Sequence, residues 1–135
     1  MALWGGRFSG KPADAVFALS QSIAFDWRLA PYDLRSSMAH LAVLENASHI
    51  SKDDAQKIRK ALKELMNEVA SGKFLPISED EDVHSCLERG LTEKLGTLGG
   101  SLRAGRSRND QVTTDLRLFS IDHMLILAQT MTELI

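Results

Sequence analysis

The sequence has a single cysteine, Cys86, among its 135 residues. One cysteine excludes an internal disulfide, and without clustered histidines it leaves no zinc-type ligand set. A catalytic thiol is disfavoured because Cys86 follows the acidic run S-E-D-E-D, whose negative charge opposes formation of a thiolate. We therefore expect Cys86 to be a packing residue in a helix, and we expect neither a metal nor a cofactor.

Long apolar runs are also missing. Residues 1–10 contain no continuous apolar stretch, and neither does any other part of the chain, so the sequence predicts neither a signal peptide nor a membrane-spanning helix. The composition, 44% hydrophobic and 25% charged, is typical of a soluble domain of ordinary size. We therefore expect a cytoplasmic protein that does not bind membranes.

An excess of positive charge is absent as well. The chain has 16 Lys and Arg residues against 18 Asp and Glu residues. No aromatic residue lies among the arginines of the most basic stretch, where it could stack on a base. These features argue against a nucleic-acid partner.

No segment alternates between apolar and polar residues with a period of two, and no repeat or low-complexity tract occurs. Apolar residues recur instead at helical spacing, which predicts an all-α fold. The expected helices are a short one around residues 12–19, a second over about 31–46, a third over 51–70, a fourth after Ser78 that ends at Gly96, and a fifth from about 110 onward.

Local signals refine these helices. Ser51 and Asp54 match a capping box, and Ser71-Gly72 is a typical helix end. Pro31 is expected to hold Ala30 in extended geometry after a turn. The run E-D-E-D places negative charge at the start of the fourth helix. Residues 96–105 have the composition of a linker.

The stretch from Gly99 to Leu118 combines a glycine-rich loop with the start of a helix. Its glycines at 99, 100 and 105 permit positive φ and close approach of a ligand, and its arginines at 103, 106 and 108 suit an anion. Ser107 or Asn109 can cap the helix, whose free N–H groups add further donors. A solvated loop is the alternative interpretation of the same residues.

The helix that starts near residue 110 shows no stop signal before Ile135. Its apolar residues need partners that the chain has few residues left to supply. We therefore expect a fragment of a longer protein, with an N-terminal helical domain over residues 1–110 and the start of a central helix-bundle domain over 111–135.

Four blocks of the sequence resemble argininosuccinate lyase, a family of the fumarase and aspartase superfamily. They are L-W-G-G-R-F at 3–8, S-I-A-F-D at 22–26, S-E-D-E-D-V-H at 78–84 and G-R-S-R-N-D-Q at 105–111. Their order and spacing fit the family. The resemblance implies reversible cleavage of argininosuccinate to arginine and fumarate, a step of arginine synthesis and, in some animals, of the urea cycle.

The resemblance also implies roles for single residues. Ser22, Asp26, Arg108 and Asn109 are carried over as substrate-binding residues, and two supporting residues are carried over beside them, Asp82 and His84. Each has a structural alternative. Ser22 could be a polar residue at a helix end, Asn109 an N-cap, Asp82 a first-turn acid, and His84 a helix histidine with satisfied hydrogen bonds.

The family's catalytic acid and base lie in later blocks, a Thr-His segment and a Ser-rich loop with Met-Pro-x-Lys, which this sequence does not contain. We therefore expect the chain alone to be inactive. Family enzymes are homotetramers with shared active sites. The competing interpretations are a sister fumarate-releasing lyase, a non-catalytic protein like the lens crystallins that resemble this lyase, and a helical interaction module.

Overall fold

The computed structural model describes residues 13–135, which contain six α-helices, two 3₁₀ helices and no strand. The all-α prediction is confirmed for this part of the chain. The block at residues 3–8 lies outside the described residues. The elements are α1 (Asp14–Ser20), α2 (Ile23–Asp26), η1 (Trp27–Leu29), α3 (Ala30–Asn46), α4 (Lys52–Ala70), α5 (Val83–Leu95), η2 (Gly96–Arg103) and α6 (Arg108–Leu134).

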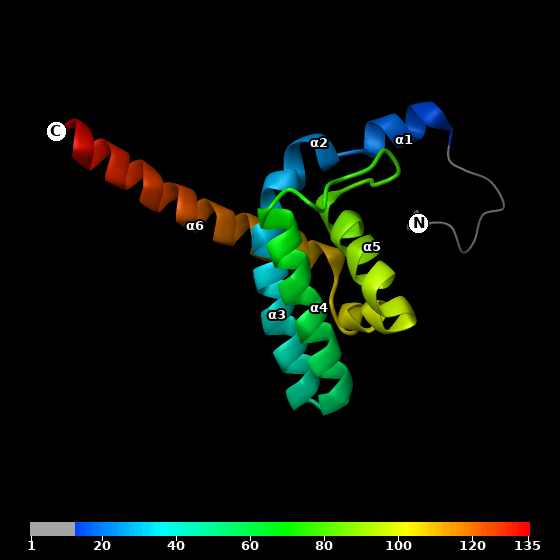
Figure 1. The fold of residues 1–135 in the computed structure, drawn as a ribbon. Coiled ribbons are helices and arrows are strands. Elements are labelled where there is room, and N and C mark those ends of the chain that lie inside the picture. The colour runs from blue at the N-terminus through cyan, green and yellow to red at the C-terminus, as the bar shows by residue number, and fades with distance from the viewer. Residues whose placement is uncertain (1–12) are drawn as a thin grey trace.

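The core forms where α3, α4 and α5 pack together (Figure 1). Each helix turns one apolar stripe inward, as the spacing of its residues predicts. The largest fully buried apolar side chains are Leu34, Leu41, Ile58, Leu62, Leu65 and Val83. This small core holds in place the helix ends and loops that carry the polar residues discussed below.

The predicted ends of α4 are confirmed. The Ser51 hydroxyl accepts a hydrogen bond from the Asp54 backbone N–H, and its own proton goes to the Asp54 carboxylate at 2.9 Å. At the other end Gly72 has a φ of 70°, a conformation that only glycine adopts without strain. The helix therefore begins and ends where its sequence signals stand.

Two local predictions before α5 are wrong. Ala30 is helical, with φ −52° and ψ −44°, rather than extended. Pro31 lies in the first turn of α3, where a missing N–H breaks no hydrogen bond, and burial of Ala30 outweighs the steric preference of a residue before proline. The run E-D-E-D precedes α5 instead of starting it, and only Asp82 reaches the helix, as its N-cap.

The predicted linker at 96–105 is largely η2, which packs against α5. Only Gly105 of the three glycines has a positive φ, at 65°, so the expectation for Gly99 and Gly100 is wrong. Gly99 allows close approach of the α5 backbone, whereas the sequence predicted close approach of a ligand. A Cβ atom there would lie 2.8 Å from the Leu91 carbonyl oxygen, so the absence of a side chain lets η2 lie against the backbone of α5.

The helix α6 packs on α3 near its start and then projects away from the rest of the molecule (Figure 1). The apolar residues Val112 and Leu116 are exposed, at 39% and 53%. The face that meets α3 carries Gln111, Asp115 and Phe119, of which Asp115 is completely buried. Polar contacts with α3 therefore set which face of α6 points inward.

In the C-terminal half of α6, apolar side chains are exposed on every side of the helix. Most of those between Ile121 and Ile135 are more than half exposed. A helix that is apolar all round is typical of the interior of a larger assembly. None of the helices within residues 13–135 is long and apolar enough to cross a membrane.

The neighbouring glycines of η2 provide a matched test of this packing. Gly99→Ala is expected to lower the free energy of unfolding by about 1–3 kcal/mol, because the new methyl group overlaps the backbone of α5. Gly100→Ala meets nothing within 4 Å and is expected to be neutral or slightly stabilising. Urea unfolding of both variants measures the difference, and equal stabilities would refute the close packing of η2.

Candidate functional site

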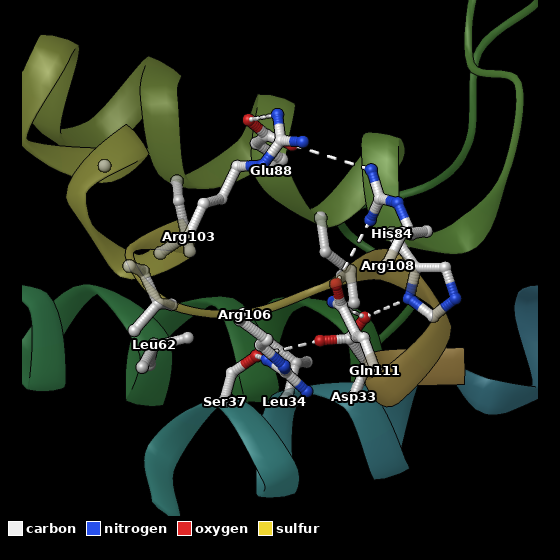
Figure 2. A pocket seen from close by; sticks show the side chains of 14 residues that line it. Asp33, Leu34, Ser37, Leu62, His84, Glu88, Arg103, Arg106, Arg108 and Gln111 are labelled. Atoms are coloured by element: carbon white, nitrogen blue, oxygen red, sulfur yellow. Dashed lines mark hydrogen bonds and ion pairs between the residues drawn. The ribbon is translucent and has the colours of Figure 1, made fainter. Parts of the chain in front are cut away.

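A cavity of about 40 Å³ opens where α3, α5, η2 and the start of α6 meet (Figure 2). Its walls include three arginines, Arg103, Arg106 and Arg108, together with Asp33 and His84. This volume accommodates a few water molecules or one small polar group.

Two residues of the cavity wall, Asp33 of α3 and His84 of α5, form a buried titratable cluster with Asp115 of α6. They are 2%, 4% and 0% exposed. His84 Nδ1 lies 2.5 Å from Asp33 Oδ2 and 3.7 Å from Asp115 Oδ2. An ionised carboxylate only accepts hydrogen bonds, so Nδ1 is the donor in the contact with Asp33.

Hydroxyl groups and one arginine complete this cluster. The Ser36 hydroxyl donates to Asp115 Oδ1 at 2.7 Å, and the Ser37 hydroxyl donates to Asp33 Oδ1 at 2.9 Å. Arg106 in turn donates to both serine oxygens, at 2.7 and 3.0 Å. The loop before α6 is therefore attached to the buried carboxylates through two serines of one helix turn.

Asp115 carries the most perturbed carboxyl of the cluster. Burial, reinforced by the negative charge of Asp33, raises its pKa to about 6. The hydrogen bond from Ser36 opposes this shift, as do the charges of His84 and Arg106. Asp115 Oδ2 has no hydrogen-bond partner among the described residues. The protonated form of Asp115 is accordingly favoured relative to a carboxyl in water.

The same three residues each offer one possible metal-ligand atom, all within 4.8 Å of one another. However, the histidine nitrogen on this side already donates its proton to Asp33, and Asp33 Oδ2 also accepts from Gln111 at 2.7 Å. A metal would have to replace both hydrogen bonds. These residues are therefore arranged as a hydrogen-bonded cluster and not as a set of metal ligands.

The predicted residues Ser22, Asp26 and Asp82 form a second group at the start of α5. The Ser22 hydroxyl donates to Asp26 Oδ2 at 2.6 Å, and Asp26 Oδ1 accepts from the Val83 backbone N–H at 3.1 Å. Burial raises the pKa of Asp26, and the negative charge of Asp82 adds to the increase. Three predicted site residues therefore lie together.

Asp82 has both a structural position and a side facing the site. Its Oδ1 accepts the backbone N–H of Ser85, and the Ser85 hydroxyl meets the Asp82 backbone N–H, which makes a reciprocal capping box. Its Oδ2 lies 4.0 Å from Arg108 Nε. Asp82 thus stabilises the start of α5, as its structural alternative predicts, although as the N-cap and not as a first-turn residue. Its second carboxylate oxygen still faces Arg108.

Arg108 begins α6, and Asn109 follows it. Ser107 is the N-cap, because its hydroxyl accepts from the Asn109 backbone N–H at 3.2 Å. Asn109 is exposed, and its side chain makes no hydrogen bond within residues 13–135. The suggestion that Asn109 merely caps the helix is therefore wrong, since the residue two positions earlier does so.

His84 is a buried helix histidine whose Nδ1 has a hydrogen-bond partner, as its structural alternative predicts. Its side chain also lines the cavity. Cys86 is a packing residue, as predicted. It is fully buried, and burial together with the nearby Asp80 carboxylate raises its thiol pKa to about 12. The Cys86 thiol is therefore not a nucleophile.

Five polar residues in or next to the buried cluster were not predicted from the sequence, and a sixth, Arg106, was predicted only as a cation of the loop. A signal was present in the second predicted helix, where polar residues occupy the same stripe as Leu34 and Leu41. A buried polar group needs a partner from elsewhere in the fold, so such residues indicate a tertiary network. The missed residues are Asp33, Ser36, Ser37, Gln111 and Asp115.

The raised pKa of Asp115 predicts a pH dependence of stability. The folded protein binds this proton more tightly than the unfolded chain does, so the stabilisation is complete below about pH 4 and is lost as the pH rises through about 6. Asp115→Asn is expected to flatten urea-unfolding free energies across this interval. Asp110→Asn, on the exposed side of the same helix, is the control and should retain the wild-type slope, whereas an unchanged slope in Asp115→Asn would contradict the assignment.

Comparison with known proteins shows the family of the chain. A family model described as Lyase matches residues 6–135. The chain is 58% identical over 134 residues to the argininosuccinate lyase of Frankia casuarinae, covering 99% of this chain and 29% of that protein. It is 55% identical over 132 residues to the argininosuccinate lyase of Acidothermus cellulolyticus, covering 98% of this chain and 27% of that protein.

A third relative, the argininosuccinate lyase of Streptomyces avermitilis, is 50% identical over 133 residues, which is 98% of this chain and 28% of that protein. The chain thus spans between a quarter and a third of the length of these curated relatives. Because the family model matches nearly all of its residues, the chain belongs to this lyase family, and over its whole length it is similar to members named argininosuccinate lyase.

Proposed function

We propose that the protein to which this chain belongs cleaves argininosuccinate to arginine and fumarate by β-elimination. The observation that carries the proposal is the 58% identity to an argininosuccinate lyase over nearly the whole chain. The residues concerned include G-R-S-R-N-D-Q, which brings Arg108 and Asn109 to the N-terminal end of α6. We assign the reaction by similarity, and the geometry supports the roles of individual residues.

The proposed chemistry explains why these residue types are required. Removal of a proton next to a carboxylate creates a carbanion whose charge spreads onto that carboxylate, and the bond to the guanidino nitrogen of the arginine product then breaks. Donors that already point at the carboxylate lower the barrier. We propose that Arg108 and Asn109 supply such donors, because the exposed Asn109 amide and the buried Arg108 Nη2 have no hydrogen-bond partner among the described residues.

We propose that Ser22 and Asp26 also contact the substrate, with Asp82 and His84 as supporting residues. Asp26 fixes the direction of the Ser22 hydroxyl, since its carboxylate accepts that proton at 2.6 Å. Asp82 lies between this pair and Arg108. The family resemblance assigns the catalytic acid and base to a Thr-His block and a Ser-rich loop, so residues outside this sequence would complete the reaction.

We further propose a homotetramer in the cytoplasm, with active sites shared between subunits. The exposed apolar side chains from Ile121 to Ile135 support an assembly of long helices, because a helix apolar on every side requires several neighbours. In this proposal the N-terminal domain ends near residue 110, and α6 begins the central bundle. Size-exclusion chromatography with light scattering would measure the assembly.

The activity itself has a direct test. The full-length protein from the same source is expected to release fumarate and arginine from argininosuccinate, while the 135-residue chain releases no fumarate above a blank. Fumarate absorbance and amino-acid analysis measure the two products. Fumarate release by the 135-residue chain would place the acid and base within it and would contradict the second half of this prediction.

Other outcomes identify the competing functions. Release of fumarate from adenylosuccinate or aspartate, and not from argininosuccinate, would indicate a sister lyase. A folded full-length protein that is inactive on all of these compounds would indicate a non-catalytic, crystallin-like protein. Both results would overturn the proposed function.

Asn109→Asp tests the proposed carboxylate contact. The aspartate would face a substrate carboxylate, and at about 4 Å with an effective dielectric near 20 the repulsion is roughly 4 kcal/mol before screening. Turnover is therefore expected to fall by about two to three orders of magnitude. Stability should stay the same or rise slightly, since an acid in the first turn of α6 interacts favourably with the helix dipole.

Asn67→Asp, on an exposed part of α4, is the matched control because it adds the same charge away from the site. Steady-state kinetics and thermal unfolding of both variants in the full-length protein give the comparison. Near-normal turnover in Asn109→Asp would exclude a substrate contact at this residue.

A further inference from the structure

Arg108 is held differently from Arg89, another partly buried arginine. Arg89 makes two hydrogen bonds to the Asp80 carboxylate, at 2.8 and 3.0 Å. Arg108 instead lies 3.8 Å from the nearest oxygen of Glu88 and 4.0 Å from that of Asp82, beyond hydrogen-bond length. Its guanidinium therefore forms a long ion pair with each of these two carboxylates and a hydrogen bond with neither.

The hydrogen bond that Arg108 does make within residues 13–135 is with a neutral side chain. Its Nη1 donates to Gln111 Oε1 at 3.3 Å, one helical turn along α6 (Figure 2). A neutral acceptor directs the guanidinium without neutralising its charge. The Arg108 Nη2 atom is buried without a hydrogen-bond partner in the described part of the chain.

Gln111 is itself oriented by the buried cluster. Its Nε2 donates to Asp33 Oδ2 at 2.7 Å, and since a carboxylate cannot donate in return, the amide oxygen must face away, toward Arg108. Asp33 is fixed by His84 Nδ1 at 2.5 Å and by the Ser37 hydroxyl at 2.9 Å. A continuous chain of hydrogen bonds therefore runs from the core to the guanidinium.

We propose that Gln111 is a positioning residue, which holds the Arg108 guanidinium away from Glu88 and Asp82 and leaves it free for a substrate carboxylate. The structural part of this inference is independent of the reaction, whereas its kinetic consequence rests on the proposed function. Without Gln111, Arg108 would move the short distance to Glu88 and turn the long ion pair into a direct hydrogen bond to Oε2, the oxygen that Arg103 leaves open when it donates to Oε1 at 3.0 Å. Substrate would then have to break that pair.

The test is Gln111→Met in the full-length protein, because methionine keeps the length of the side chain and removes both hydrogen bonds. The expected result is a fall in kcat/KM of about tenfold or more, the size of one hydrogen bond to a charged group. The loss should appear in kcat as well as in KM, since the carboxylate is charged in the bound substrate and gains further charge as the proton leaves. Gln56→Met, on an exposed part of α4, is the matched control.

A second pair of variants separates positioning from a general effect on the fold. Glu88→Gln removes the competing charge, so the combination Gln111→Met with Glu88→Gln is expected to recover most of the lost kcat/KM. A role of Gln111 in stability alone would show as lower thermal stability with no such recovery. Values of kcat/KM within about twofold of wild type in folded Gln111→Met would overturn the proposal.

A crystal structure of Gln111→Met distinguishes failure of this inference from failure of the proposed function. Arg108 is expected to lie within hydrogen-bond distance of Glu88 in the variant. If the unaltered protein does not cleave argininosuccinate, the proposed function fails, and this structure still decides the positioning role. An Arg108 side chain that keeps its place beside residue 111 would refute it.

Discussion

The hydrogen bond between His84 and Asp33 is the contact on which the polar half of this structure depends. Removing a carboxylate and an imidazole from water is unfavourable unless their hydrogen-bonding atoms find partners. Here the partners come from four places: Ser37 on the same helix, His84 on α5, Gln111 on α6 and, through Ser37, Arg106 in the loop between η2 and α6. Satisfying one buried carboxylate therefore sets the relative positions of three helices.

This constraint explains an unusual feature of α6. Its first turns are attached to α3 by polar contacts, at Gln111 and at Asp115, and its apolar residues Val112 and Leu116 face outward. The hydrophobic effect alone would favour turning those two apolar residues toward α3. The N-terminal end of α6 thus has a defined orientation and leaves an apolar face exposed in the described part of the chain.

The sequence predicted the helices well because their apolar residues follow the helical period and their ends carry recognisable residues, such as Ser51 and Gly72. It failed where tertiary contacts override local preference. Ala30 is helical because it is buried. Gly99 and Gly100 lie in a 3₁₀ helix that packs closely on α5, where the Leu91 backbone leaves no space for a side chain at Gly99. The start of α6 was ambiguous between Ser107 and Asn109, since either residue can cap.

For the candidate site, the sequence identified the residues of the family motifs but not the ones that hold them. Arg108 and Asn109 stand in a recognisable block, whereas Asp33 and Asp115 are single acids in ordinary helices, and their burial follows only from the packing of helices distant in sequence. No local pattern reports that Asp33 lies opposite His84, 51 positions away. A polar residue on a predicted apolar stripe is the one warning that sequence offers.

Several residues of the candidate site have a structural role and also face the site. Asp82 uses one carboxylate oxygen to cap α5 and presents the other to Arg108, and His84 uses Nδ1 in the core while its side chain lines the cavity. Asp26 likewise accepts from the backbone at the start of α5 and from Ser22. Each residue is held by one of its polar atoms, and so the others are fixed in space. A group that meets a ligand in a defined geometry needs such support, and the residues that we propose to act on the substrate have it because they lie where helices begin.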